Sequence, residues 1–137
     1  MYERAVLGMD DARRAIDAVL EQALQDPAHP VAVAVADPDG DVIAYARMDG
    51  AGHLPRDMAV RKAYTSARMG ADTGPWSERM GAAGIDLKDL GDPRLAGFAG
   101  GVCVRSGGAV VGAVGVSGRS AEEDDVLARL GAAAIGG

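Results

Sequence analysis

Apolar residues near the start of the chain recur at helical spacing. After Asp10, a residue type that caps helices, apolar side chains stand at positions 12, 16, 19, 20 and 23, and an Asp-Pro pair ends the pattern. This spacing predicts a helix over residues 10–25. The β-branched runs at 31–36 and 41–47 flank the turn sequence Asp-Pro-Asp-Gly, so they predict two strands joined as a β-hairpin.

The middle of the chain predicts a loop and two helices. Residues 48–55 contain two glycines and a proline and predict the loop, and Pro55 suits the first turn of a helix that runs to Gly70. Small residues recur along one stripe of this helix, which suits close contact with a sheet. A short helix follows from Thr73 to about Met80.

The last third of the chain predicts a second hairpin and a final helix. Residues 81–97 are rich in glycine and predict irregular chain or a short edge strand. Alternating valines then predict strands on both sides of a Gly-Gly turn. Ser120 and Glu123 match a capping box that opens the last helix. The order α-ββ-αα-(β)ββ-α clusters the strands, which favours an α+β fold with helices packed on an antiparallel sheet.

Composition narrows the class of protein. A chain of 137 residues is long enough for one domain, residues 1–137, and aromatics at 4% with 20 glycines predict a core of small aliphatic side chains. The net charge of −6 argues against nucleic acid and anionic membranes as partners. The single cysteine favours a reducing compartment, and no apolar run is long enough to span a bilayer, so we expect a cytoplasmic protein.

Several patterns that resemble functional motifs are better explained by structure. The glycines at 112, 115 and 118 lack the spacing of a dinucleotide fingerprint and predict a strand that a helix approaches closely. Neither His29 nor His53 has a partner histidine at helical spacing, so no metal site is predicted. Ser117 lies outside a nucleophile-elbow sequence and is expected to be a strand-end hydroxyl, and Cys103 is expected to be an inert buried thiol.

Positive charge is concentrated around the glycine loop. Arginines at 47, 56, 61 and 68 bracket this loop together with Lys62, and Thr65 follows on the same helical stripe as the lysine. Such a cluster suits a ligand that bears carboxylates, because guanidinium groups pair with carboxylates through two hydrogen bonds while a lysine supplies a point charge. The alternative is a helix surface balanced by neighbouring acids such as Asp57.

Motifs along most of the chain resemble those of one family. They are the segment at 33–37, Arg-Met-Asp-Gly-Ala at 47–51, Lys-Ala-Tyr-Thr at 62–65, the glycine pair at 100–101, Gly-Ala-Val-Gly-Val-Ser-Gly at 112–118 and Asp124. In this order and spacing they resemble the GlcG/HbpS-like haem-binding family, which includes the C-terminal domain of PduO-type proteins. The resemblance implies a profilin-like α+β sandwich of order α-ββ-αα-βββ-α, with a five-stranded antiparallel sheet, homo-oligomers, and haem binding in some members.

Two functional hypotheses remain open at this point. The first is a binding module for haem or a related carboxylate-bearing molecule, with His53, Tyr64 or a methionine as axial group. The second is a small enzyme that acts on an organic acid, with His53 or Asp49 as acid or base. Both use a ligand site between the 47–55 loop, the second helix and the glycine-rich segments. The predicted site residues are Arg47, Asp49, His53, Lys62, Thr65, Gly100, Gly101, Ser117 and Gly118.

Overall fold

The computed structural model describes residues 1–135, so positions 136 and 137 of the predicted domain lie outside the described residues. The helices and strands follow the predicted order. Their bounds are α1 Met9–Ala23, β1 Ala32–Ala36, β2 Val42–Arg47, α2 His53–Met69, α3 Thr73–Ala82, the short 3-10 helix η1 Leu87–Leu90, β3 Gly101–Ser106, β4 Ala109–Ser117 and α4 Ala121–Ile135.

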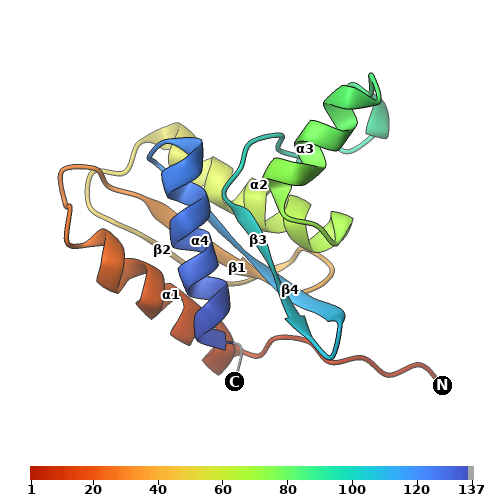
Figure 1. The fold of residues 1–137 in the computed structure, drawn as a ribbon. Helices are drawn as coiled ribbons and strands as arrows, with labels where there is room; N and C mark the ends of the chain where they lie inside the picture. The colour runs from red at the N-terminus through yellow and green to blue at the C-terminus, as the bar shows by residue number, and fades with distance from the viewer. Residues whose placement is uncertain (136–137) are drawn as a thin grey trace.

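The strands form one antiparallel sheet in the order β2-β1-β4-β3. Helices α1 and α4 cover one face of this sheet and α2 covers the other, while α3 and η1 project beyond it (Figure 1). The sheet therefore has four strands among the described residues, and the expected fifth strand is wrong. Residues 83–99 form η1 and turns instead, because Gly84 and Gly91 adopt left-handed φ angles of 70° and 75° that interrupt an extended chain.

The face of the sheet toward α1 and α4 is built from valines. Val33 and Val35 of β1 and Val114 and Val116 of β4 point to this side and are fully buried against the two helices. Successive residues of a strand point to opposite faces, so the residues between these valines form the other surface.

Alanine and glycine form the face toward α2. Ala32 and Ala34 of β1 and Ala113 of β4 pack on Ala59 and Ala63 of the helix. At Gly115, a β-carbon would overlap the carbonyl oxygen of Ala59 and lie 2.5 Å from the backbone nitrogen of Ala63. The predicted stripe of small residues on this helix is confirmed, and it brings the α2 backbone into direct contact with the sheet.

The observed starts of three helices can be compared with the starts that their capping residues predict. The predicted capping box is present in part: Glu123 N donates to Ser120 Oγ at 3.2 Å, while the Glu123 carboxylate accepts from the Ser120 hydroxyl at 2.8 Å rather than from the Ser120 backbone. The cap of α1 is Gly8 rather than Asp10, and Gly8 N donates to the Asp11 carboxylate at 2.9 Å. Helix α2 begins at His53, two residues before the predicted proline.

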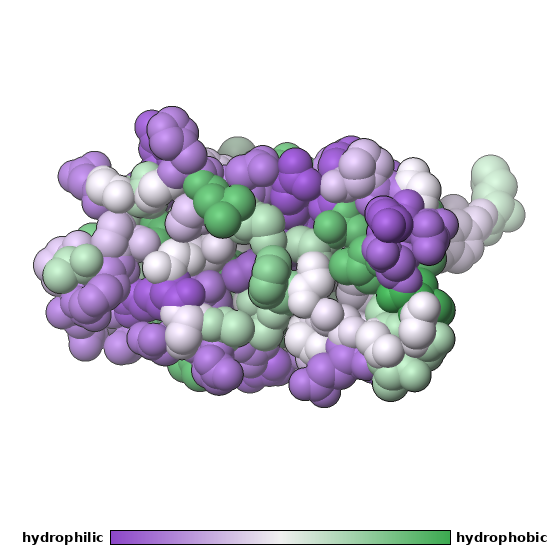
Figure 2. Space-filling view, turned by 90° about the horizontal axis from the view of Figure 1, so that it is seen from above, coloured by the Kyte–Doolittle hydropathy of each residue, from purple (hydrophilic) through white to green (hydrophobic). Residues whose placement is uncertain are grey.

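The surface mixes polar and apolar patches. On the face seen in Figure 2, hydrophobic residues form separate patches between hydrophilic ones. Within residues 1–135, no helix is both long enough and apolar enough to cross a membrane.

Candidate functional site

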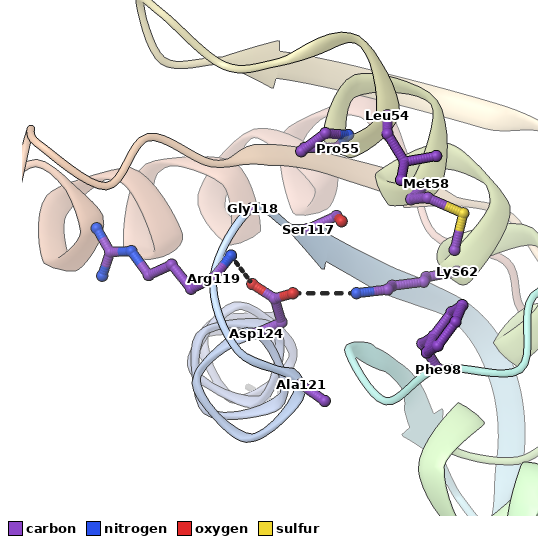
Figure 3. Close-up of a pocket in the computed structure, with 10 residues that line it drawn as sticks. All are labelled: Leu54, Pro55, Met58, Lys62, Phe98, Ser117, Gly118, Arg119, Ala121 and Asp124. Atoms are coloured by element: carbon purple, nitrogen blue, oxygen red, sulfur yellow. Dashed lines mark hydrogen bonds and ion pairs between the residues drawn. The ribbon is translucent and has the colours of Figure 1, made fainter.

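A cavity of about 310 Å³ opens where α2, the end of β4 and the start of α4 meet. Its walls are mostly apolar, and its polar groups come from α2, the end of β4, the turn after it and the beginning of α4 (Figure 3). The lining residues are Leu54, Pro55, Met58, Lys62, Phe98, Ser117, Gly118, Arg119, Ala121 and Asp124.

A buried ion pair lies on the polar side of this cavity. Lys62 Nζ is 3.1 Å from Asp124 Oδ2, and the two side chains are only 4% and 3% exposed. The same ammonium donates to the carbonyl oxygen of Val116 at 3.0 Å. Lys62 therefore ties α2 to both β4 and α4, and Asp124 already balances its charge.

Asp124 has a second partner in the turn before α4. The backbone N–H of Arg119 donates to Asp124 Oδ1 at 2.9 Å, while the Arg119 guanidinium points away from the cavity (Figure 3). That guanidinium donates instead to the carbonyl oxygens of Ala23, Asp26 and His29. Burial raises the pKa of the Asp124 carboxyl, because the loss of water outweighs the attraction of Lys62.

The glycine pair at the start of β3 makes room for the lysine. A β-carbon on Gly100 would lie 2.8 Å from Lys62 Nζ and 2.6 Å from the carbonyl oxygen of Val116, and one on Gly101 would overlap the Lys62 carbonyl oxygen. Both glycines thus pack against Lys62 rather than line the cavity. Gly118 does line it, with a φ of 143° that favours glycine.

Ser117 places a free hydroxyl in the cavity. The residue is 7% exposed at the end of β4, and its Oγ has no hydrogen-bond partner within the described chain. Across the cavity stand Leu54, Met58 and Phe98 (Figure 3). The hydroxyl is accessible from the cavity, since no buried side-chain oxygen or nitrogen of the described residues lacks a partner, and it can therefore contact a polar atom of a ligand.

Besides Gly100 and Gly101, four more of the predicted site residues lie outside the cavity. Arg47 and Asp49 are exposed at the end of β2 and in the following loop. His53 is exposed at the start of α2, where its Nδ1 lies 2.7 Å from the Arg56 guanidinium. Thr65 is fully buried, donates to the Arg61 carbonyl oxygen at 2.8 Å and accepts from Ala96 N at 2.9 Å. Of the nine predicted residues, the structure brings Lys62, Ser117 and Gly118 together around the cavity.

The arginines of the positive cluster do not converge on the cavity. Arg61 pairs with Asp57 at 2.9 Å on the surface of α2, and Arg68 donates to the carbonyl oxygen of Asp39 at 2.8 Å. For these two residues, a helix surface with local partners is the better description. Lys62 is the member of the cluster that reaches the cavity.

A loop held on α2 carries one wall of the site. The Tyr64 hydroxyl hydrogen-bonds the Asp92 carboxylate and accepts from Arg94 at 2.5 Å. The Arg94 guanidinium also stacks 4.1 Å from the centroid of the Tyr64 ring. Together with the bond from Ala96 to Thr65, these contacts fix the segment that leads to Phe98.

Sequence reasoning missed most of the apolar wall and the partner of Lys62. Leu54, Met58 and Phe98 carry no motif, and Phe98 follows directly after the glycine-rich segment 81–97. Asp124 is visible in sequence as an acid in the first turn of the last helix, where it opposes the positive end of the helix dipole. Its pairing with a lysine 62 positions earlier is a tertiary contact.

The fold and this cavity describe a small α+β protein with a partly enclosed, mostly apolar cavity. The model of the family described as haem degrading protein HbpS-like matches residues 7–133. The chain belongs to the HbpS-like family.

Three relatives illustrate the likeness. The crystal structure of a double mutant of HbpS from Streptomyces reticuli superposes with a TM-score of 0.90 and 36% identity, covering 100% of this chain and 92% of that one. An uncharacterised 15.0 kDa protein of Citrobacter freundii is 34% identical, covering 90% of this chain and 88% of its own length. The haem complex of PduOC superposes with a TM-score of 0.84 and 28% identity, covering 95% of each chain.

Proposed function

We propose that this protein binds a small, largely apolar molecule that bears a carboxylate, and that haem is the first candidate. The observation that carries this proposal is the cavity itself, whose apolar walls lead to the Ser117 hydroxyl and the Lys62 ammonium. Membership of the HbpS-like family and the haem bound to PduOC support haem as the molecule to test first.

The lining residues fit the edge of a haem ring. Leu54 and Phe98 are 69% and 64% exposed at the rim, so they offer apolar contact to a flat ring that extends beyond a cavity of about 310 Å³. Met58 is the lining residue with a side chain of the kind that ligates haem iron. When bound, haem would supply a redox-active iron. Ser117 and Lys62 would then meet a propionate.

A titration with haem tests this function directly. Purified protein is expected to develop a Soret band that saturates at a fixed ratio of haem to chain, and Phe98→Ala is expected to weaken binding by removing one wall. Met58→Leu keeps the apolar volume, so it should still bind iron-free porphyrin while the spectrum of its haem complex changes. A thermal-shift screen with small aromatic and aliphatic carboxylic acids runs in parallel. If neither haem nor any acid binds, the proposed function is wrong.

A second candidate is an enzyme that acts on an organic acid in the same cavity. The observation in its favour is a buried Lys62–Asp124 pair next to a free serine hydroxyl, since functional sites often hold titratable groups in such surroundings. In this case Lys62 anchors the acid and Ser117 hydrogen-bonds it. Chemical change in a panel of organic acids, followed by NMR and lost in Ser117→Ala, would favour catalysis over binding alone.

We also propose that the protein assembles into homo-oligomers. Val126 and Leu130 form an exposed apolar stripe on α4, and they are 59% and 41% exposed. Such patches commonly mark contacts between proteins. Light scattering at micromolar concentration is expected to give a mass above the 13.9 kDa of one chain; a mass equal to one chain would contradict assembly.

A further inference from the structure

The positive charge in the cavity is already balanced before a carboxylate ligand binds. An ammonium group has three N–H donors, and Lys62 uses two of them on Val116 and Asp124. The third donor and the Ser117 hydroxyl remain for a ligand. The Lys62 charge, however, is already balanced, because the Asp124 carboxylate lies 3.1 Å away in the same buried space.

A second carboxylate at this position would place two negative charges around one positive charge. Both anions would lie where water is largely excluded, since the side chains of Lys62 and Asp124 are almost fully buried. Neighbouring carboxylates in one site raise the pKa of one of the pair until it holds a proton. One shared proton removes the repulsion and adds a hydrogen bond between the two carboxyl groups.

We propose that the cavity binds its carboxylate ligand together with one proton, which is held between Asp124 and the ligand. The proposal rests on the proposed function and deepens it, because it names the ligand class as a carboxylate that is bound in a proton-sharing pair. On binding, the ligand anion enters and one proton is taken up from solvent. The two carboxyl groups, from Asp124 and the ligand, then share one proton and one negative charge, which the positive charge of Lys62 balances.

The groups around Asp124 identify it as the site of the proton. From α2 it meets Lys62, and from the preceding turn it meets the backbone of Arg119, whose guanidinium is bonded elsewhere. On α4, Glu123 bonds Ser120, and Asp125 bonds Arg129, outside the cavity. Burial already raises the pKa of Asp124 before any ligand is present.

Proton uptake makes affinity depend on pH in a defined direction. The complex holds one proton more than the free protein and the free ligand anion, so binding weakens as pH rises. Where uptake is complete, the Kd rises by about tenfold for each pH unit. A neutral ligand of the same shape takes up no proton and shows no such slope.

The test uses 2-naphthoate and its neutral amide, 2-naphthamide, as flat ligands. Isothermal titration of the wild-type protein in two buffers of different ionisation enthalpy counts the protons taken up, and a pH series from 5 to 8 gives the slope. Naphthoate is expected to take up one proton and naphthamide none. The buffer experiment needs no variant, so it stands even if a substitution harms folding.

The variant Asp124→Asn removes the competing charge, and Asp125→Asn is its matched control. In Asp124→Asn the ligand becomes the counter-ion of Lys62, so naphthoate is expected to bind about tenfold more tightly at neutral pH and to lose its pH dependence. Asp125→Asn is expected to behave as wild type. Circular dichroism checks that both variants are folded.

The outcomes separate the two proposals. Binding of naphthoate without proton uptake, or an unchanged pH slope in folded Asp124→Asn, overturns proton-coupled binding and leaves the proposed function standing. If naphthoate does not bind while haem does, the proton-sharing site for carboxylates is overturned and the haem function stands. If neither binds, both proposals fail.

Discussion

The two faces of the sheet are filled in opposite ways. On the face toward α1 and α4, valines such as Val33 and Val114 fill the space between the sheet and the helices. On the face toward α2, alanines and Gly115 let the backbone of the helix touch the backbone of the sheet. The first face is stabilised by side-chain volume and the second by close approach. The site lies at the end of the second face, where the long side chain of Lys62 runs past Gly100 and Gly101.

The largest loss of stability is expected from a substitution that keeps α2 from lying close to the sheet. Gly115→Val would drive a branched side chain into the backbone of α2 at Ala59 and Ala63. We expect a loss of about 4 kcal/mol or more in the free energy of unfolding, because the neighbours that it meets are backbone atoms that cannot rotate away. Urea denaturation followed by circular dichroism measures this, and a midpoint equal to wild type would show that α2 is not held close at this position.

A slightly smaller effect is expected from Lys62→Met, which breaks the buried ion pair at the end of this face. The expected loss is about 3 kcal/mol, because Asp124 is left as an unpaired buried carboxylate. Its pKa is already raised by burial, so it destabilises the folded state as pH rises above the ordinary value of 3.8. The deficit should therefore shrink on acidification. A deficit that is the same at acid and neutral pH would contradict this account.

Val114→Ala tests how much valine packing stabilises the face of the sheet toward α1 and α4. Removing two methyl groups from a fully buried position between the sheet and α4 should cost about 2 kcal/mol through lost contacts and a cavity. The same measurement applied to Ala34→Gly on the α2 face gives the contrast. The comparison of the faces would be wrong if trimming the α2 face cost more than trimming the valine face.

The smallest effect is expected at the outer side of α2, where Tyr64 holds the loop that leads to Phe98. Tyr64→Phe removes the hydroxyl that bonds Asp92 and Arg94, at a cost of about 1 kcal/mol. Hydrogen exchange should become faster in residues 92–98. Tyr45→Phe is the matched control, because its hydroxyl makes one exposed 3.3 Å bond to the Arg56 carbonyl oxygen. Equal protection of the loop in both variants would show that Tyr64 does not hold it.

Local signals predicted the elements well because their causes are local. The Asp-Pro-Asp-Gly turn, the Ser120–Glu123 cap and the small stripe on α2 each depend on residues a few positions apart. The fifth strand, which the resemblance implied and which the segment 81–97 offered as one alternative, is wrong because residues 83–99 lack the alternation that a strand needs.

The candidate site was only partly predictable from the sequence because its contacts join residues that are far apart in the chain. Lys62 and Ser117 were visible as a cation and a strand-end hydroxyl, but the partner of Lys62 depends on how α4 returns to the sheet. The same holds for Gly100, whose close approach to the Lys62 side chain is a tertiary contact between α2 and the residue before β3. Such contacts between distant segments follow from the packing of the whole chain.

Arg119 links two regions of the chain that are 96 positions apart at its longest contact, the bond to Ala23. Its backbone N–H donates to the Asp124 carboxylate, and its guanidinium donates to carbonyl oxygens at and just after the end of α1, those of Ala23, Asp26 and His29. The residue thus connects the candidate site to the segment at the end of α1 through hydrogen bonds alone. When a ligand binds in the cavity, the amide resonances of the α1–β1 connection are therefore expected to shift in NMR spectra, although the ligand does not touch this connection.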